Sequence, residues 1–253
     1  MEPLLLVASA AVGYLCGSIS NARIITRITS PGTDISKIEY KVPQYDEVFT
    51  SDSVSASAAR MHLGVKWGVL TAILDMAKVA IPTLAFKLWQ PDTPYYLVVA
   101  AFGLVGHDWP IFFRFQGGRG ESPIYGGLIV IDWLGALLMN LLGFLVGFVL
   151  RNLLVLRWAG LVLLIPWIWL RTGSLPHLAY IVFVNLVYWY AMSPELKEYF
   201  ELGKKDINPS QEEIAEFLGM GAKLGHTLDT YSWWSLIGRK RSGGEKEQSE
   251  GQG

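Results

Sequence analysis

The apolar stretch IYGGLIVIDWLGALLMNLLGFLVGFVL, residues 124–150, decides the fold of this chain. Asp132 is its one charged residue, and the stretch is longer than the roughly 20 residues that an upright helix needs to cross a bilayer. We therefore expect a break at Asp132 and Trp133, with a short helix over Ser122–Ile131 and a second helix over Trp133–Leu150. The short helix has to be shielded by its neighbours, because backbone polar groups find no water in hydrocarbon.

Five further apolar stretches approach or reach the length of a membrane-crossing helix. They cover Pro3–Ile19, Val65–Trp89, Tyr95–Phe113, Leu153–Leu170 and Leu178–Met192. Over the 253 residues, 51% are hydrophobic and the mean hydropathy is +0.33, which is high for a soluble domain. Because the stretches do not alternate as barrel strands do, the sequence predicts an all-α, polytopic integral membrane bundle of about seven transmembrane helices.

Lysine and arginine residues are unevenly distributed among the loops, although the formal net charge is only −1. They are numerous between the first two spans, follow the third at Arg114 and Arg119, and recur after Met192, whereas the loop Gln90–Pro94 has none. The positive-inside rule then places the N-terminus outside the cell membrane, and the first and third connections and the tail in the cytoplasm. Seven crossings satisfy this assignment and six do not, so the charges also favour the break at Asp132.

The N-terminal span is predicted to be a retained helix. It carries Glu2 and no Lys or Arg in its leading region, and it lacks a clear cleavage site, so it does not resemble a signal peptide. The single cysteine, Cys16, lies inside this span, and no intrachain disulfide is therefore expected.

We divide the chain into a membrane domain, residues 1–200, and a polar cytoplasmic tail, residues 201–253. The tail contains one predicted amphipathic helix, Pro209–Leu224, and the residues from Ser210 to Glu213 resemble a capped helix start. Beyond this helix, an apolar set either lies at the membrane interface or packs as a cluster. Its members are Tyr231, Trp233, Trp234, Leu236 and Ile237. From Arg239 onward, the charged and Gly/Ser-rich composition predicts disorder.

Residues 106–120 read GHDWPIFFRFQGGRG and join the end of an apolar span to a glycine-rich turn. Glycines leave backbone N–H groups free to approach an anion, and Arg119 adds a charged guanidinium. The stretch is typical of a phosphate site at the mouth of a membrane helix. A tight turn with Arg119 on lipid phosphates fits the local pattern equally well. His107 either serves structure alone or orients a loop, binds phosphate or shuttles a proton.

The connection Thr29–Leu63 contains the serine-rich run TSDSVSASAAR at residues 50–60. Small hydroxyl residues followed by Arg60 suit an anion site at the start of a helix, while composition by itself favours a flexible serine linker. In the next span, Asp75 and Lys78 lie three residues apart on one helix face. This spacing is typical of an ion pair that stabilises a helix.

Several kinds of site are disfavoured by the residue spacings. The four histidines are scattered without partner ligands, which argues against a metal site. No Gly-x-Ser-x-Gly elbow or Cys–His pairing supports a covalent nucleophile, and the glycine turn lacks the Lys-Ser/Thr ending of a nucleotide P-loop. The aromatic residues follow the membrane boundaries and not a nucleic-acid stacking pattern. We expect no metal, no cofactor and no nucleic-acid partner.

Taken together, these motifs resemble those of the acyl-phosphate-dependent glycerol-3-phosphate 1-acyltransferases of bacterial membranes. Gly13–Ser20 looks like that family's N-terminal Gly-Ser-Ile-Pro helix, and Leu63–Lys78 follows its second-helix pattern. Gly106–Gly120 is similar to its motif Gly-His-x-Phe-Pro-Val-Phe-x-x-Phe-Lys-Gly-Gly-Lys-Gly. The similarity extends over about residues 10–192, and the family's seven-helix fold agrees with the break at Asp132.

The resemblance implies transfer of a fatty acyl group from acyl phosphate to the 1-hydroxyl of sn-glycerol 3-phosphate. The product is lysophosphatidic acid, a step of phospholipid biosynthesis, and the implied partners are the two substrates and membrane lipids. The resemblance implies catalytic roles for Ser51, His107 and Arg119. It implies phosphate binding by Ser53, Ser57, Arg60, Gly117, Gly118 and Gly120, and supporting roles for Asp75 and Lys78.

The charges suggest how such a site would work. Arg60 and Arg119 would neutralise two phosphate-bearing substrates that otherwise repel each other, so Ser51, Arg60 and Arg119 should converge in one cytoplasmic cleft. No protein base is evident from the sequence, so a substrate phosphate is expected to accept the hydroxyl proton.

The chain also departs from the family pattern. Asp52 adds negative charge where phosphate is expected, and Gln116 replaces the first motif lysine. Met192–Glu195 stands in place of a His-Arg-Glu-Asn run, so the family's His and Asn are absent. These departures leave an alternative open, a non-catalytic or substrate-altered membrane relative that binds a phosphate-bearing lipid or ligand. The sequence does not indicate an oligomeric state.

Overall fold

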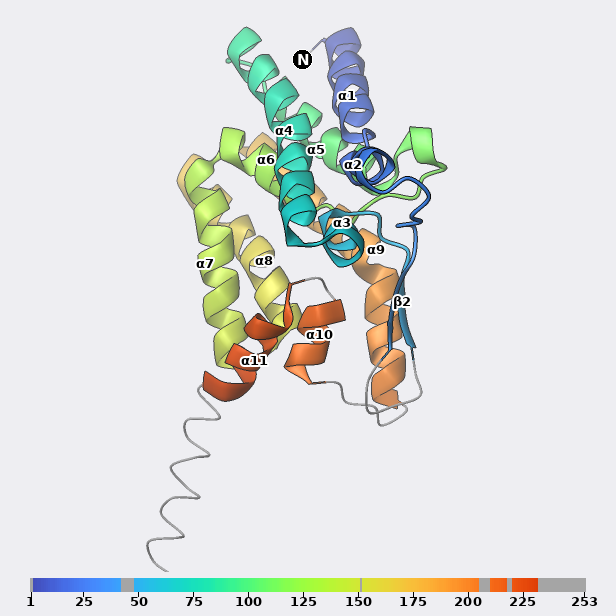
Figure 1. Cartoon of the computed structure of the whole chain (residues 1–253). Helices are drawn as coiled ribbons and strands as arrows, with labels where there is room; N and C mark the ends of the chain where they lie inside the picture. The colour runs from blue at the N-terminus through green and yellow to red at the C-terminus, as the bar shows by residue number, and fades with distance from the viewer. Residues whose placement is uncertain (1, 42–47, 151, 205–209, 218–219, 232–253) are drawn as a thin grey trace, which may run out of the picture.

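The computed structural model describes residues 2–41, 48–150, 152–204, 210–217 and 220–231, and it is a bundle of helices with one small hairpin (Figure 1). The N-terminal half contains α1 (Pro3–Gly17), α2 (Asn21–Thr29), β1 (Ile38–Lys41), β2 (Val48–Ser51), α3 (Ala56–Leu63), α4 (Val65–Trp89), α5 (Tyr95–Asp108) and the 3-10 turn η1 (Ile111–Phe113). The C-terminal half contains α6 (Glu121–Ile131), α7 (Trp133–Leu150), α8 (Leu153–Thr172), α9 (Leu175–Lys204), α10 (Gln211–Phe217) and α11 (Ala222–Tyr231).

Six helical segments of the described chain are long and apolar enough to cross a membrane. They are Pro3–Thr29, Val65–Trp89, Tyr95–Phe113, Trp133–Leu150, Leu153–Thr172 and Leu175–Glu201, and α6 adds a shorter apolar helix. The predicted break is confirmed, because α6 ends at Ile131 and α7 begins at Trp133. The prediction of about seven membrane helices corresponds to the six long segments together with α6.

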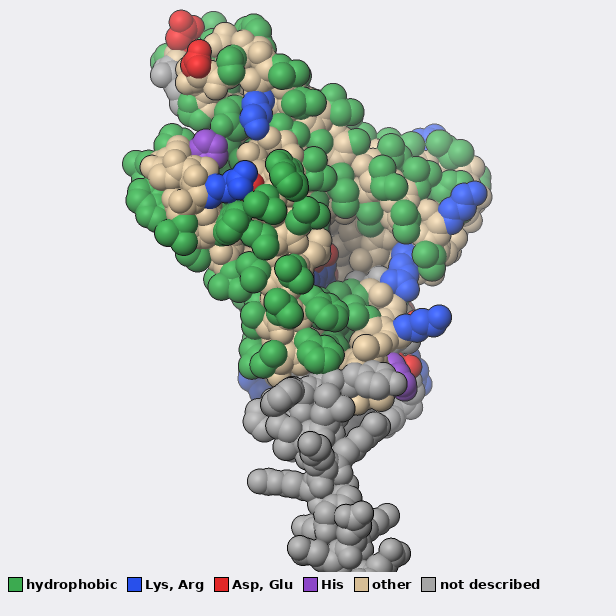
Figure 2. All heavy atoms as spheres, turned by 90° about the vertical axis from the view of Figure 1, so that its left-hand side faces the viewer, with side chains coloured by type: hydrophobic (Ala, Val, Ile, Leu, Met, Phe, Trp, Pro, Cys, Tyr) green, Lys and Arg blue, Asp and Glu red, His purple; other side chains and the backbone are tan. Residues whose placement is uncertain are grey.

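Apolar side chains also cover the outside of the bundle. Figure 2 shows hydrophobic side chains over most of the face that α7 presents. One row of exposed residues on this helix recurs at every fourth position, as expected for one face of a helix. The row consists of Trp133, Leu137, Leu141, Leu145 and Val149. Contiguous exposed apolar surface of this kind is normal only where lipid or another protein covers it.

Asp132 interrupts the apolar stretch because its carboxylate is bound inside the bundle. Trp167 Nε1 donates a hydrogen bond of 2.8 Å to one carboxylate oxygen, and Arg171 Nε lies 3.1 Å from the other. Lys87 Nζ donates to the backbone carbonyl of Val130 at 2.5 Å, which satisfies an acceptor at the end of α6. The end of the short helix is therefore shielded by α4 and α8.

The connection between α1 and α4 is folded, so its interpretation as a flexible linker is wrong. β1 and β2 pair antiparallel with Ile38 opposite Ser51, and β2 lies along the lower half of α9 (Figure 1). Thr50 N donates to Glu198 Oε1 at 2.7 Å, which ties this strand to α9. Composition could not reveal this arrangement, because the serines are held by contacts with residues far along the chain.

The tail forms two helices, so the single helix predicted over Pro209–Leu224 is wrong. The chain reverses at Gly221, where φ is +93° and glycine has no steric penalty. The predicted cap is confirmed, because Ser210 N donates to Glu213 Oε2 at 2.8 Å and Glu213 N donates to Ser210 Oγ at 3.2 Å.

Both tail helices pack their apolar side chains against α8 and form a small hydrophobic core with it. The buried members of this core are Leu153, Leu154, Ile214, Ala215 and Leu228. Helix α9 runs on to Lys204, past the predicted domain boundary at residue 200. Of the predicted interfacial set, Trp233, Trp234, Leu236 and Ile237 lie outside the described residues, as does the sequence from Arg239 onward.

Candidate functional site

Two cavities share a wall where the serine run, the glycine turn and α9 meet. The larger has a volume of about 450 Å³, and its charged lining comprises Lys37, Glu39, Asp52, Arg119, Glu195 and Glu198. The smaller has a volume of about 20 Å³, room for about one water. It is lined mainly by Ser51, Ser53, Ser55, Ser57, Arg119, Arg157 and Glu195. Ser51, Arg119 and Glu195 belong to both linings and form the shared wall.

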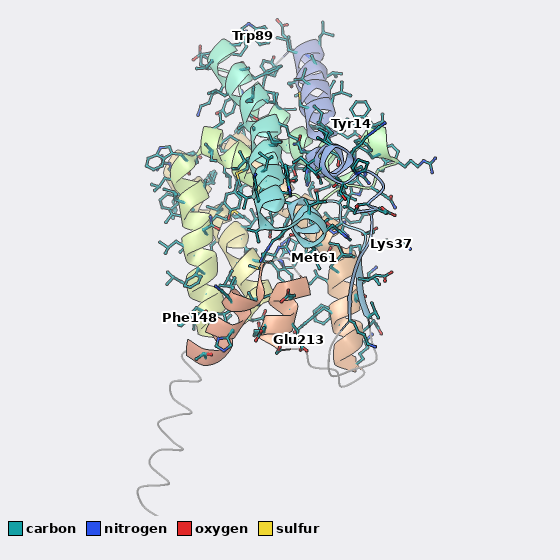
Figure 3. The ribbon with its side chains drawn as sticks, viewed as in Figure 1. Tyr14, Lys37, Met61, Trp89, Phe148 and Glu213 are labelled. Carbon is teal, nitrogen blue, oxygen red and sulfur yellow. The ribbon has the colours of Figure 1, made fainter. Side chains whose placement is uncertain are left out.

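The cavities lie well away from the loop between α4 and α5. Figure 3 shows Lys37, which lines the larger cavity, beside the hairpin, and Trp89 at the far end of α4. The site therefore sits on the side of the bundle where the first and third connections gather.

Arg119 is the charged centre of the shared wall. Its Nε lies 3.0 Å from Glu195 Oε1, and its Nη2 lies 2.5 Å from Asp52 Oδ1. The Arg119 side chain is 12% exposed, whereas that of Asp52 is 61% exposed. A guanidinium that holds two carboxylates has the planar donor geometry that also suits phosphate oxygens. A phosphate that binds here has to compete with these carboxylates, of which Asp52 is the more accessible.

Glu195 is a site residue that the sequence prediction missed. Ser51 Oγ donates a hydrogen bond of 2.6 Å to Glu195 Oε1, and both residues are buried. A signal was present, because Glu195 falls where the resembled family has its His-Arg-Glu-Asn run.

Arg157 is a second missed residue. It comes from the apolar helix α8 and lines the smaller cavity. Its Nε pairs with Glu121 Oε1, to which Tyr188 also donates a hydrogen bond of 2.9 Å. An arginine within an apolar span is itself a signal of function, because such a charge is costly in a membrane.

The glycine turn packs closely against its neighbours. Gly118 N donates to the His107 carbonyl at 3.1 Å, so this amide is not free for an anion. Gly117 O accepts from Val54 N at 2.8 Å, which joins the turn to the serine run. A side chain at Gly117 or Gly118 would collide with His107. The glycines therefore allow close packing that positions Arg119.

Gly120 completes this turn. It adopts a left-handed conformation with φ +84° immediately before α6, which favours glycine. A Cβ there would also meet Leu104 and the carboxylate of Asp108. Like Gly117 and Gly118, Gly120 supports the turn that carries Arg119, and none of these three glycines is among the residues that line the two described cavities.

His107 is buried behind the turn, whereas the sequence placed it among the catalytic residues. Lys78 Nζ donates to His107 Nδ1 at 2.9 Å and to the Ile19 carbonyl at 2.6 Å. Lys78 also pairs with Asp75 at 2.9 Å, and Asn21 Nδ2 donates to the same carboxylate at 2.9 Å. Because the ammonium donates to Nδ1, the ring proton belongs on Nε2, which faces Gly118. This network links α2, α4 and α5 beneath the glycine turn.

The predicted convergence of three residues holds for only two of them. Ser51 and Arg119 share the cavity wall, and Ser57 lines the smaller cavity. The guanidinium of Arg60 instead lies beside Gly221 of the tail. Arg157 supplies the second arginine of the smaller cavity, because helix packing brings α8 to the position that the sequence assigned to Arg60.

Comparisons with known proteins bear on this site. The family model described as "Glycerol-3-phosphate acyltransferase" matches residues 7–201. A protein of that description from Mesoplasma florum is 30% identical over 178 residues, which cover 67% of this chain and 64% of the relative. Another, from Photorhabdus laumondii, is 32% identical over 122 residues, or 47% of this chain and 50% of the relative. The chain thus spans between half and two thirds of the length of these relatives.

The fold also matches solved structures. Crystal structures of PlsY, an integral membrane glycerol 3-phosphate acyltransferase, in its glycerol 3-phosphate and lysophosphatidic acid forms superpose with a TM-score of 0.64. Their sequences are 22% and 21% identical to this one, and the match covers 78% of this chain and 92% of theirs. With its six candidate spans, the chain is a multi-pass integral membrane protein.

Proposed function

Because the chain belongs to the glycerol-3-phosphate acyltransferase family, we propose that it transfers a fatty acyl group from acyl phosphate to the 1-hydroxyl of sn-glycerol 3-phosphate. The product is lysophosphatidic acid, which enters phospholipid biosynthesis. Its partners are these two substrates and the surrounding membrane lipids.

The observation that carries this proposal is the shared wall between the two cavities. Arg119 and Arg157 lie with serine residues around the smaller cavity, and Lys37 adds a cation to the larger one. Hydroxyl donors and guanidinium groups are the side chains that bind phosphate oxygens. The larger cavity, with a volume of about 450 Å³, has room for phosphate groups, and the smaller one, about 20 Å³, places Arg157 and the serines next to Arg119.

The same arrangement supports acyl transfer. Holding the acceptor hydroxyl and the acyl carbonyl together in the larger cavity, against Arg119, makes their encounter effectively intramolecular. Arg119 is positioned to stabilise negative charge on the carbonyl oxygen and on the departing phosphate. The Asp52 side chain is 61% exposed, so water can hydrate its carboxylate when phosphate displaces it from Arg119.

A direct assay tests the proposed reaction. The purified protein in a membrane mimic, supplied with acyl phosphate and glycerol 3-phosphate, is expected to form acylglycerol phosphate, measured by mass spectrometry. A family member of known activity in the same mimic is the positive control. Lack of product while that control turns over would refute the activity.

A second candidate function is a substrate-altered or non-catalytic relative that binds a phosphate-bearing ligand. The acidic lining of the larger cavity favours an altered set of substrates, because Glu39, Asp52 and Glu198 oppose a second phosphate-bearing substrate beside one bound to Arg119. Protection from thermal unfolding by inorganic phosphate, with no turnover of glycerol 3-phosphate, is the result that would favour this alternative.

We further propose that the protein lies in the cell membrane with its N-terminus outside and with the cavities and tail in the cytoplasm. The distribution of Lys and Arg supports this orientation. In a Cys16→Ser background, Asp92→Cys should react with a membrane-impermeant maleimide in intact cells. Pro31→Cys should react only after permeabilisation, and the reverse pattern would invert the topology. Both positions are exposed in connecting loops.

A further inference from the structure

We propose that a lipid-facing groove between α1, α5 and α9 holds the far end of the fatty acyl chain and selects the length of that chain. The inference rests on the proposed acyltransferase function and adds a chain-binding subsite to it. The chain leaves the larger cavity at Pro194, follows the seam between α5 and α9, and ends in the groove.

The groove has the composition of a hydrocarbon site. Its volume is about 270 Å³, and among the described residues that line it none is charged. The hydroxyl of Tyr180, the polar group of this lining, lies close to Gly127 of α6. Such a groove accommodates an acyl chain and excludes a phosphate headgroup, because burial of an unpaired charge is costly. Side chains that border it include Leu6, Leu97, Ala101, Phe102, Ala179 and Phe183.

Helices α5 and α9 pack side by side, and aromatic pairs mark the seam between them. Phe102 stacks on Phe183 with ring centroids 6.4 Å apart, and the rings of Trp109 and Tyr190 are 5.5 Å apart. The second pair lies two turns beyond the first on both helices, so the two helices run parallel in one register. Phe102, Phe183 and Tyr190 are 37%, 38% and 71% exposed. The rings therefore form an apolar floor that is open to lipid.

One face of α9 connects this floor with the larger cavity. Phe183, Val187, Tyr190 and Pro194 follow one another at intervals of three or four residues, so they share a helix face. Phe183 lines the groove, and Pro194 lines the larger cavity together with Arg119. An acyl chain whose carbonyl lies against Arg119 thus meets a continuous apolar path from the cavity to the groove. This continuity identifies the chain of the acyl donor as the occupant.

The length of the path predicts which chains reach the groove. At the helical rise, roughly 16 Å of α9 separates Pro194 from Phe183. An extended carbon chain advances about 1.2 Å per bond, as in an extended backbone, so about 13 carbons span this distance and further carbons enter the groove. Lipid tails are as apolar as the groove, so the groove favours a chain through close packing and not by removing it from water. We expect a moderate preference for chains of about 16 to 18 carbons over chains of about 12.

The decisive variant is Ala179→Phe, which fills the groove. Acyl phosphates of 12 and 18 carbons compete at equal concentration, and mass spectrometry of the two products gives the ratio of their kcat/KM values. We expect the variant to lower the ratio of the 18-carbon to the 12-carbon product about fivefold or more, because the new ring displaces the end of the longer chain. The rate with the 12-carbon donor alone should stay within about twofold of the wild type, because this chain does not reach the groove.

Two further variants separate selection of chain length from a general disturbance of α9. Val182→Phe is the matched control, because it adds a ring at an exposed position of the same helix that is not among the described residues of the groove lining. It should leave the product ratio within about 1.5-fold of the wild type. Ala179→Leu fills less of the groove and should give an intermediate ratio, so the test remains possible if Ala179→Phe is not recovered in folded form.

A crosslinking measurement tests occupancy of the groove without turnover. Lysophosphatidic acid with a photoreactive diazirine at the end of an 18-carbon chain should label the segments of α5 and α9 that contain Phe102 and Phe183. Peptide mass spectrometry locates the label, and an excess of unlabelled lysophosphatidic acid should suppress it. Labelling elsewhere in the bundle would overturn the proposed path of the chain.

The outcomes are distinguishable. If the wild type forms product and Ala179→Phe keeps the product ratio within about twofold, the acyl chain does not use the groove while the proposed function stands. Labelling by a diazirine phosphatidylcholine that lysophosphatidic acid does not suppress would assign the groove to a membrane lipid instead. A disulfide between two copies of Ala179→Cys, in a Cys16→Ser background, would assign it to a second copy of the chain. If the wild type forms no product from either donor, the proposed function fails and this inference fails with it.

Discussion

Replacing Arg119 by alanine is expected to lower kcat/KM for acyl transfer by about 1000-fold or more. Single donors to a developing oxyanion contribute about 100- to 1000-fold, and arginines that stabilise phosphoryl groups contribute similar or larger factors. Arg119 has both roles in the proposed reaction and borders both cavities. The loss should appear in kcat and KM alike, because ground-state phosphate binding also weakens.

The variant also leaves Glu195 and Asp52 without their shared cation. Without this cation, the two carboxylates repel phosphate, which deepens the loss. Arg119→Lys should be intermediate, because a single ammonium cannot reproduce the planar donor geometry. Arg27→Ala is the control, since this arginine is exposed on α2 and lines neither of the two cavities. Activity of Arg119→Ala within fivefold of wild type would contradict the electrostatic account.

Replacing Gly17 by valine is expected to destabilise the whole bundle. Helix α1 packs directly on α5, and a Cβ at Gly17 would run into the backbone of Gly103. The two helices cannot shift to make room, because they are equally close at neighbouring positions. Gly13 packs on the backbone of Val99, and Gly106 packs on the backbone of Tyr14. Small residues at such spacings let membrane helices approach closely, and a branched side chain forces the helices apart.

Overpacking of this kind costs about 3 kcal/mol or more where backbone blocks the new atoms. At about 2–4 °C per kcal/mol for a chain of this size, Tm in detergent should fall by about 6–12 °C, or folded protein should not be recovered. Activity should fall as well, since α1 leads to Ile19, whose carbonyl binds Lys78 of the network beneath the glycine turn. Ala11→Val, on the exposed side of α1, should leave Tm within about 2 °C, and equal losses in both variants would argue against tight helix packing as the cause.

The architecture of the bundle could be predicted because it follows from local physics. A bilayer demands a minimum length of apolar sequence, and a buried carboxylate such as Asp132 is tolerated only at a break with partners at hand. The family resemblance of the run from Gly106 to Gly120 could also be predicted, because its order of residue types is specific. The contacts of this run in the fold could not be predicted. The Gly118 amide, which the sequence suggested was free for an anion, instead donates to the His107 carbonyl.

The sequence by itself determined the membrane spans, the break at Asp132, the family resemblance and the choice of Arg119 and Ser51 as candidate site residues. Only the tertiary structure decided which groups meet them. Ser51 bonds Glu195 across 144 positions, Arg157 arrives from an apolar helix, and Arg60 turns to the tail. The physical reason is that hydropathy and motif spacing act along the chain, whereas a site is assembled across helices whose relative placement depends on close packing at residues such as Gly17 and Gly118.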